Sequence, residues 1–481
     1  LLAGAWRYGG QVKQVRGWLL VLLLGLPLAC IGAVNDQERQ FYRAAENALA
    51  KRDWDAFDGY RGQLDTYPLA IYLDYYALEA RLRLLSPGEV QAFMAVSGDT
   101  PLQLRLKGRY LSRAGKDRRW DDYLAVADSR PNSIKLQCYY YRAQLASGDR
   151  ARAWQGAESL WVHGESRPDE CDPLFNAWMK AGELTDAIAW RRMLKAFDNR
   201  RSSLMTYAAR KGSDELQPWA EILRDVYRTP ARLSLQNSLP VDDPRSSDVL
   251  AHGLPRLARN DPPRALATWL RVRESYDFDE LQRRKVTDAI AWQTLFRDAQ
   301  ENRAWLDAYL LERGDDRLLE TRLRAALRES DWPAVERYAA ALSSERQRAT
   351  AWRFWRAMAL QERGERDTAD ALLTELAGER DYYGFLAAER LGRAYSLNHE
   401  PIYPVPLLDA LASLGGVQRA GELMYHGEPL LAHSEWYHLV SRRPEQEREY
   451  LSFYAGQQGW HRLAIDAATQ AQAWDRLELR F

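Results

Sequence analysis

The chain has 481 residues, of which 46% are hydrophobic and 11% aromatic, and its 67 basic residues balance its 67 acidic residues. A net charge of zero gives no field that would steer the chain onto nucleic acid or an anionic membrane, which excludes either kind of binding as its main task. The 18 Trp and 25 Tyr supply enough buried area to offset the entropy of ordering, which excludes intrinsic disorder.

The first 33 residues have the features of a secretory signal peptide. Basic residues precede an apolar run at 17–29, and small residues follow the run up to Ala33. The run of about 13 residues is shorter than the roughly 20 that a membrane-spanning helix needs. We expect cleavage near Ala33. Cys30 leaves lipidation as an alternative, although Pro27 departs from the lipoprotein pattern.

Two cysteines, Cys138 and Cys171, remain once such a leader is removed. In an oxidising compartment they could form one disulfide, which would stabilise the fold by about 3–4 kcal/mol, or stay as two core thiols. A zinc site needs more ligands than this pair offers, and the nearest histidine, His163, has no second histidine close by. We expect no metal and no cofactor.

The rest of the chain is predicted to be helical almost throughout. Apolar residues three and four positions apart share a helix face, as at 352–360, and the alternation typical of strands is nearly absent. Short polar turns recur, each followed by an aromatic residue that would lie in the first turn of the next helix. These turns precede Trp54, Trp120, Trp305, Trp332 and Trp460. Their irregular spacing excludes a strict array of ~34-residue repeats, but the pattern indicates an α-solenoid of about two dozen helices.

Two segments interrupt the helical pattern. Residues 229–247 are rich in Pro and Asp, which predicts loops around a short helix. Three prolines at 401–406 exclude a continuous helix and predict a domain boundary near 380–400. Interleaved charges, as at 315–322, are expected on solvated faces with local ion pairs. The preference for Arg over Lys is interpreted as a bias of genome composition.

Five segments together resemble the soluble lytic murein transglycosylases of Gram-negative bacteria. These segments are 67–75, with its Tyr-Pro pair, 138–175, with both cysteines, 352–355, 382–392, and 422–425 together with 434–436. They follow one another in the family's order over about 400 residues. The resemblance implies that Cys138 and Cys171 form a disulfide joining the flanks of a helical hairpin whose turn is 147–149.

The resemblance also implies an all-α fold with two domains after the signal peptide. A signal peptide at 1–33 precedes an α-superhelical domain at 34–380, a ring-like solenoid of helical hairpins, and a small helical linker domain at 381–481. Members of the family continue into a lysozyme-like domain that cleaves the MurNAc–GlcNAc bond of peptidoglycan. That reaction gives a 1,6-anhydro product and uses one glutamate as acid and then as base. The implied location is the periplasm.

The family's catalytic glutamate lies in a Glu-Ser pair that is followed by a Gly-Ala-x-Gly-Leu-Met-Gln run. The Glu-Ser pairs of this chain begin at Glu165, Glu274 and Glu329, and none is followed by such a run. Glycoside cleavage needs a carboxylic acid of raised pKa, but 67 acidic residues offer no means of choosing one. We expect no catalytic residue, and no lysozyme-like domain, within these 481 residues.

Aromatic residues gather near the end of the chain at Trp460, Trp474 and Phe481. The resemblance implies that they face the lysozyme-like domain, since exposed aromatic patches mark interfaces. The expected function is therefore that of the non-catalytic superhelix and linker of a lytic transglycosylase, with peptidoglycan glycan strands and a lysozyme-like domain as partners. Nucleic-acid binding and stable membrane insertion are not expected. The main alternative is a free-standing periplasmic solenoid that binds a protein partner, and an enzyme with an unrecognised site is a third.

Overall fold

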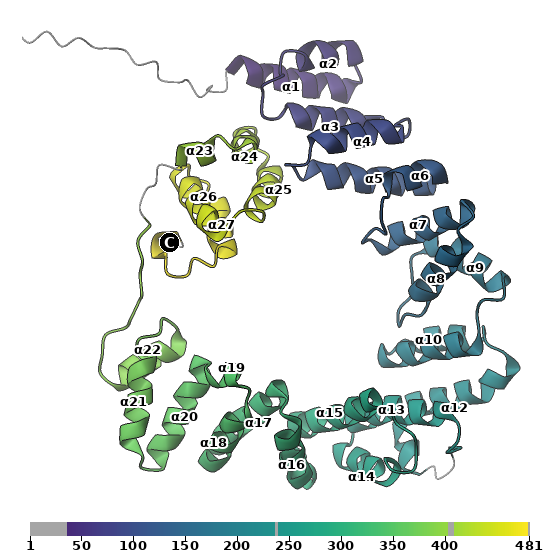
Figure 1. Cartoon of the computed structure of the whole chain (residues 1–481), viewed down its shortest axis with the longest axis vertical. Coiled ribbons are helices and arrows are strands. Elements are labelled where there is room, and N and C mark those ends of the chain that lie inside the picture. The colour runs from purple at the N-terminus through teal and green to yellow at the C-terminus, as the bar shows by residue number, and fades with distance from the viewer. Residues whose placement is uncertain (1–35, 236–238, 403–407, 480–481) are drawn as a thin grey trace, which may run out of the picture. The chain divides into compact units, whose positions relative to one another are not determined.

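The computed structural model describes residues 36–235, 239–402 and 408–479 (Figure 1). In these ranges all regular secondary structure is helical, with 27 α-helices and five short 3-10 helices. The prediction of an all-α fold is confirmed. The expected signal peptide with Cys30, and Phe481 at the other end, lie outside the described residues. Within the described ranges, no helix combines the length and the apolar character needed to cross a membrane.

The chain divides into two compact units, of which the first ends at Ala70. Its described part contains α1 (Asp36–Lys51) and α2 (Trp54–Arg61), which pack against each other. The ring of Tyr42 lies 5.4 Å from that of Tyr67, and both side chains are buried. These contacts give the first unit a small aromatic core of its own.

The second unit runs from Ile71 to Phe481, and most of its helices pack against their neighbours in sequence. Its first helices are α3 (Ala70–Ala80), α4 (Pro87–Val96), α5 (Leu102–Lys116), α6 (Trp120–Val126), α7 (Ile134–Ala146), α8 (Arg150–Trp161), α9 (Asp172–Lys180), α10 (Asp186–Asp198), α11 (Ser202–Ala209) and α12 (Gln217–Arg228). The middle helices are α13 (Pro244–Ala258), α14 (Pro262–Val272), α15 (Glu280–Arg297), α16 (Arg303–Arg313), α17 (Asp316–Glu329), α18 (Trp332–Ala341), α19 (Ser344–Gln347), α20 (Thr350–Glu362), α21 (Arg366–Leu376) and α22 (Tyr382–Arg390). The last are α23 (Leu408–Ala412), α24 (Gly415–Tyr425), α25 (Pro429–Val440), α26 (Glu445–Gln457) and α27 (His461–Gln470), called here the C-terminal helices.

The five 3-10 helices are short and lie between the α-helices. They are η1 (Asp169–Cys171), η2 (Asp214–Leu216), η3 (Pro230–Ser234), η4 (Gln300–Asn302) and η5 (Leu477–Leu479). The helix η3 is the one short helix described within the Pro- and Asp-rich segment, as the sequence predicts. No helix is described between Arg390 and Leu408, where the sequence predicts a domain boundary, and that boundary stays a prediction.

The turns before the tryptophans share one backbone geometry. Arg52, Arg118 and Ser330 have φ angles of 59°, 58° and 54°, and each lies two residues before a Trp that begins a helix. A left-handed residue at this point lets the following N–H groups bond to the last carbonyls of the preceding helix. In the first of these turns the N–H of Asp53 bonds to the carbonyl of Ala48 at 3.0 Å. The predicted aromatic residue in the first helical turn is confirmed there.

The apolar core of the second unit is shared among successive groups of helices. One cluster includes Leu319 and Tyr338 and extends from α15 to α20, and a second joins α20, α21 and α22. The C-terminal helices have their own cluster around the fully buried Trp436. Each group therefore buries its apolar face against its neighbours, as a solenoid requires.

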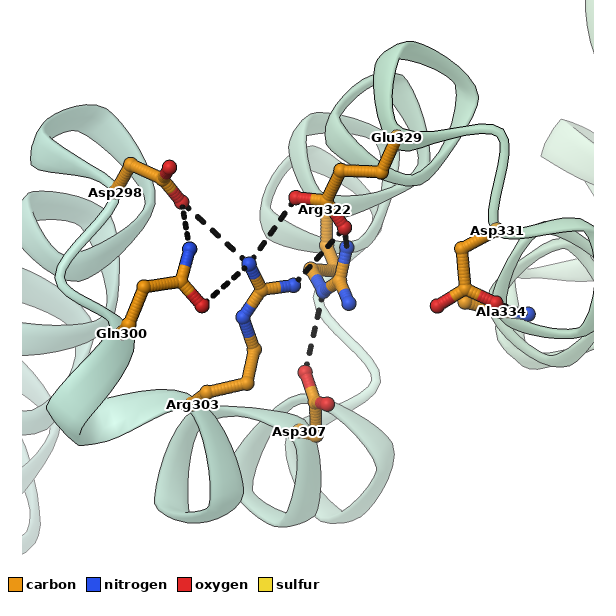
Figure 2. Close-up of polar contacts among 8 residues, drawn as sticks. All are labelled: Asp298, Gln300, Arg303, Asp307, Arg322, Glu329, Asp331 and Ala334. Atoms are coloured by element: carbon orange, nitrogen blue, oxygen red, sulfur yellow. Dashed lines mark hydrogen bonds and ion pairs between the residues drawn. The ribbon is translucent and has the colours of Figure 1, made fainter.

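The charges at 315–322 are not all solvated as expected. Glu320 and Arg322 are only 8% and 3% exposed. The Nε of Arg322 donates to Asp307 at 3.2 Å and its Nη1 to Glu329 at 3.4 Å, as Figure 2 shows. Carboxylates from α16 and from the end of α17 thus offset the desolvation of this guanidinium. Local spacing in the sequence cannot reveal partners that come from a neighbouring helix.

Candidate functional site

The two cysteines form a disulfide between α7 and η1. The Cα atoms of Cys138 and Cys171 are 4.8 Å apart, and both side chains are fully buried. Between the cysteines lies the hairpin of α7 and α8, whose turn is 147–149 and whose second helix is capped by Asp149, which accepts from the N–H of Arg152 at 3.1 Å. The predicted disulfide and hairpin are confirmed. The bond closes the hairpin covalently and is structural.

The glutamates of the three Glu-Ser pairs are each paired with an arginine. The carboxylates of Glu165, Glu274 and Glu329 lie 3.1 to 3.2 Å from the guanidinium groups of Arg201, Arg273 and Arg303, respectively. The hydrogen bond from Arg303 lowers the pKa of Glu329 below its ordinary value, and Arg322 lowers it further. A general acid for glycoside cleavage needs a raised pKa. The surroundings of Glu329 therefore favour a structural ion pair.

A buried polar network connects the C-terminal helices with α3. The hydroxyl of Tyr72 donates to Oε1 of Glu435 at 2.8 Å, and Nε of Arg419 donates to Oε2 of the same carboxylate at 3.0 Å. Tyr72 and Glu435 are fully buried, and Arg419 is 7% exposed. Every oxygen of this carboxylate thus has a donor, which is the condition for burying a charge at acceptable cost.

Further contacts extend this network to α5 and to the loop before it. Nη2 of Arg419 donates to the backbone carbonyl and to the carboxylate of Asp99, both at 2.9 Å. Nη2 of Arg105 donates to Oγ of Ser434 at 3.1 Å. The residues joined here are more than 300 positions apart in sequence. The network therefore fixes the C-terminal helices to the first helices of the second unit.

Burial dominates the electrostatics of the network. Desolvation raises the pKa of Glu435 above its ordinary value, while Arg419 and Tyr72 act in the opposite direction. Burial also raises the pKa of Tyr72, and the nearby Glu435 raises it further. A carboxyl of raised pKa is a usual mark of an active site, but this one is enclosed by Tyr72 and Arg419 and is 0% exposed. It cannot reach a substrate, so we interpret this carboxyl as a structural group that holds α25 against α3 and α24.

The C-terminal helices also carry an apolar cleft of about 510 Å³ between α26, α27 and η5. The cleft is lined by residues that include Phe453, His461, Ala464, Ile465 and Leu479. Ile465 is 53% exposed, so part of its aliphatic surface is open to solvent at the cleft. No pattern in the sequence indicates this cleft, because its lining comes from three elements and includes small and aliphatic residues besides Phe453.

The aromatic residues predicted near the end of the chain lie in different surroundings. The ring of Trp460 lies edge-on to those of Trp436 and Tyr454, at 6.2 and 6.0 Å, and packs on the core of the C-terminal helices. Trp474 is 44% exposed, and Phe481 lies outside the described residues. Their role at an interface stays a prediction. In the described part of the chain no three His, Cys, Asp or Glu side chains are grouped so that they could hold a metal ion.

Comparisons with known proteins agree on one family. The family described as "Soluble lytic murein transglycosylase L domain" matches residues 410–477. The soluble lytic murein transglycosylase of Escherichia coli is 28% identical over 478 residues, which are 98% of this chain and 74% of that protein. The crystal structure of the 70 kDa soluble lytic transglycosylase from Escherichia coli matches with a TM-score of 0.77 and 27% identity, covering 93% of this chain and 73% of that one. The lytic transglycosylase Slt of Pseudomonas aeruginosa, solved as an inactive mutant, matches with a TM-score of 0.79 and 32% identity, covering 92% and 72%.

Proposed function

Because the chain belongs to the soluble lytic murein transglycosylase family, we propose that its described residues form the part of a periplasmic lytic transglycosylase that positions peptidoglycan for cleavage. The observation that carries this proposal is the likeness over nearly the whole chain, including the L-domain match at 410–477. Glycan strands are the substrate, and they are held and oriented by the helices.

Cleavage itself is assigned to a lysozyme-like domain outside the described residues. Two features support this division of roles. The Glu-Ser pairs of the chain lack the run that follows the family's catalytic glutamate, and the carboxyl of raised pKa at Glu435 is sealed from solvent. The lysozyme-like domain would dock on the apolar cleft beside Ile465, where burial of exposed aliphatic area favours association.

The test combines binding and cleavage on purified peptidoglycan sacculi. The protein is expected to sediment with sacculi and to release no 1,6-anhydro-muropeptides, as measured by chromatography and mass spectrometry. Release that a single carboxylate substitution abolishes would place a catalytic site within these residues and contradict the proposal. A protein that stays in the supernatant would contradict the positioning role and favour a solenoid that binds a protein partner.

A further inference from the structure

A polar groove of about 500 Å³ lies on the second unit and is lined mostly by residues in or next to α13, α15 and α17. Of these helices, α13 contacts α15 and α15 contacts α17, and Figure 1 labels all three. The lining of the groove includes Arg200, Arg259, Asp288, Trp292, Asp315 and Arg317. Three of these six side chains are arginines, contributed by the turn after α10, by the turn after α13 and by α17. Cations from separate segments of the chain therefore converge on one concave surface.

The two acidic side chains of the groove are already engaged. Asp288 accepts from the hydroxyl of Tyr309 at 2.6 Å and lies 3.4 Å from the guanidinium of Arg313. Asp315 caps α17 by accepting from the N–H of Leu318 at 3.1 Å. Neither carboxylate makes an ion pair with an arginine of the groove.

Two of the three arginines of the groove have no side-chain partner in the described residues. In the described part of the chain, the side chains of Arg200 and Arg259 make no hydrogen bond and no ion pair. Burial lowers the pKa of Arg259, and repulsion from the neighbouring Arg200 and Arg256 lowers it further, while the charge of Asp198 acts in the opposite direction. Arg259 is partly buried and Arg200 is exposed beside it, and repulsion between two such cations costs stability unless an anion binds between them. Their arrangement points to a ligand with negative charge.

The aromatic residue of the groove argues against a neutral sugar as that ligand. The guanidinium of Arg317 lies 4.4 Å from the ring centroid of Trp292 and so covers one face of the indole. A sugar ring could not stack on that face of Trp292, because the guanidinium of Arg317 already occupies it and is held there by a cation–π contact. The groups that the groove offers to a ligand are therefore guanidinium groups.

A second polar cluster lies one helical turn away along α13 and α15. Nζ of Lys285 lies 2.8 Å from the carboxylate of Asp198 and 2.7 Å from Nδ1 of His252. Asp198 also contacts Nδ1 of His252 at 2.8 Å, so this carboxylate is shared between two groups. The hydrogen bonds of Asp198 are therefore taken by Lys285 and His252, and its charge acts on Arg259 only without direct contact.

We propose that this groove binds the carboxylate groups of a short acidic peptide, of the kind attached to peptidoglycan glycan strands. Arginine forks match carboxylates in a bidentate geometry, and the volume suits a few residues. The origin of the peptide in peptidoglycan rests on the proposed function. The presence of a carboxylate site rests on the groove alone.

Calorimetric titration of the protein tests the site. The probes are a synthetic tetrapeptide with two free carboxylates, the same peptide with both groups amidated, and inorganic phosphate. We expect the acidic peptide to bind, the diamide to give no binding heat, and phosphate to bind at least tenfold more weakly than the peptide. Equal binding of peptide and diamide, tighter binding of phosphate, or no binding by any probe would each overturn the proposal.

Variants of the protein locate the site. The double substitution Arg200→Gln with Arg259→Gln should weaken binding of the acidic peptide at least tenfold. The control is Arg348→Gln. Arg348 lies outside the groove, is exposed and has no side-chain partner in the described part of the chain, so this substitution should leave the affinity unchanged. Because the double substitution relieves repulsion, its melting temperature should not fall. If the double variant did not fold, Arg200→Gln alone would decide, since that side chain is exposed and unpaired. Unchanged affinity in the folded variants would contradict the proposal.

Failure of this inference can be told apart from failure of the proposed function. If the protein sediments with sacculi but does not bind the acidic peptide, the positioning role is retained and the carboxylate site in the groove is refuted. A protein that binds the peptide through Arg200 and Arg259 but does not sediment with sacculi retains the carboxylate site and refutes peptidoglycan as its source.

Discussion

The guanidinium of Arg419 and the carboxylate of Glu435 form an ion pair that is almost completely shielded from solvent. Nε lies 3.0 Å from Oε2, and the two side chains are 8% and 0% exposed. A buried pair of this kind gains little over an apolar pair of equal volume, because both charges lose their hydration. Removal of one partner has a larger effect, since the other charge is left in a medium of low polarity.

Substitution of Arg419 by Ala is therefore expected to lower the free energy of unfolding by about 3–5 kcal/mol. Urea denaturation followed by circular dichroism measures this loss. The matched control is Arg443→Ala, which breaks a pair with Glu447 whose side chains are 34% and 30% exposed and should cost no more than about 1 kcal/mol. The triple variant Tyr72→Phe, Arg419→Met and Glu435→Leu, which also removes the Tyr72 hydroxyl that Glu435 accepts from, should recover most of the stability. Equal losses of stability for Arg419→Ala and Arg443→Ala would show that burial of the Arg419–Glu435 pair does not increase the cost of breaking it.

The disulfide gives a second prediction about stability. Cys138 and Cys171 are separated by 33 positions, and closing a loop of that length restricts the unfolded chain by about 3–4 kcal/mol. Replacing both cysteines by Ala should lower the free energy of unfolding by that amount, and a reducing agent should destabilise the native protein but not the variant. Mass spectrometry of unreduced peptides from exported protein checks the bond directly. Two free thiols there would contradict it.

Local features of the fold could be predicted from the sequence. A polar turn followed by Trp marks the start of α2, α6 and α18 because the signal, an aromatic residue after a helix-ending turn, is contained in a few consecutive residues. The conformation of the turn was less evident. Arg52 and Arg118 occupy the left-handed region that glycine usually fills, so the residue type alone did not identify them.

The ion-pair cluster of Figure 2 makes stability depend on pH. Arg303 and Arg322 lower the pKa of Glu329 from its ordinary value of 4.5. A lowered pKa in the folded state means that this contribution is fully present above about pH 4.5 and is lost as the pH falls through the folded-state pKa. The melting temperature of the native protein should thus exceed that of Glu329→Gln at neutral pH, by an amount equivalent to no more than about 1 kcal/mol because the carboxylate is partly exposed.

Melting curves between pH 7 and pH 3 test this dependence. The difference between the native protein and Glu329→Gln should be constant down to about pH 5 and should shrink below the ordinary pKa of 4.5. Glu345→Gln, at an exposed glutamate without an ion pair, serves as the control and should follow the native curve. A difference that grows towards low pH would show that Glu329 is not held as a carboxylate by the two arginines.

The network around Glu435 and the cationic groove could not be predicted from the sequence. Tyr72 and Glu435 are 363 positions apart, and helical periodicity carries no information about contacts at such a distance. The arginines of the groove come from two turns and from α17, and each looks like an ordinary member of an arginine-rich chain. Family resemblance did single out the segment 434–436, but the burial of its glutamate follows only from tertiary packing.

The cleft beside Ile465 gives the most direct test of the proposed domain partner. Ile465 is 53% exposed, so Ile465→Asp should leave folding intact while removing apolar area from the interface. Burial of one aliphatic side chain contributes about 1.5–3 kcal/mol, so the affinity for a separately produced lysozyme-like domain should fall roughly 10- to 100-fold. Sedimentation velocity with the added domain measures this change. Leu430→Asp, at a residue of α25 that is 74% exposed and outside the cleft lining, should leave the affinity unaltered. A native protein that remains a monomer and ignores the added domain would contradict the assignment of this cleft, and it would favour the free-standing solenoid instead.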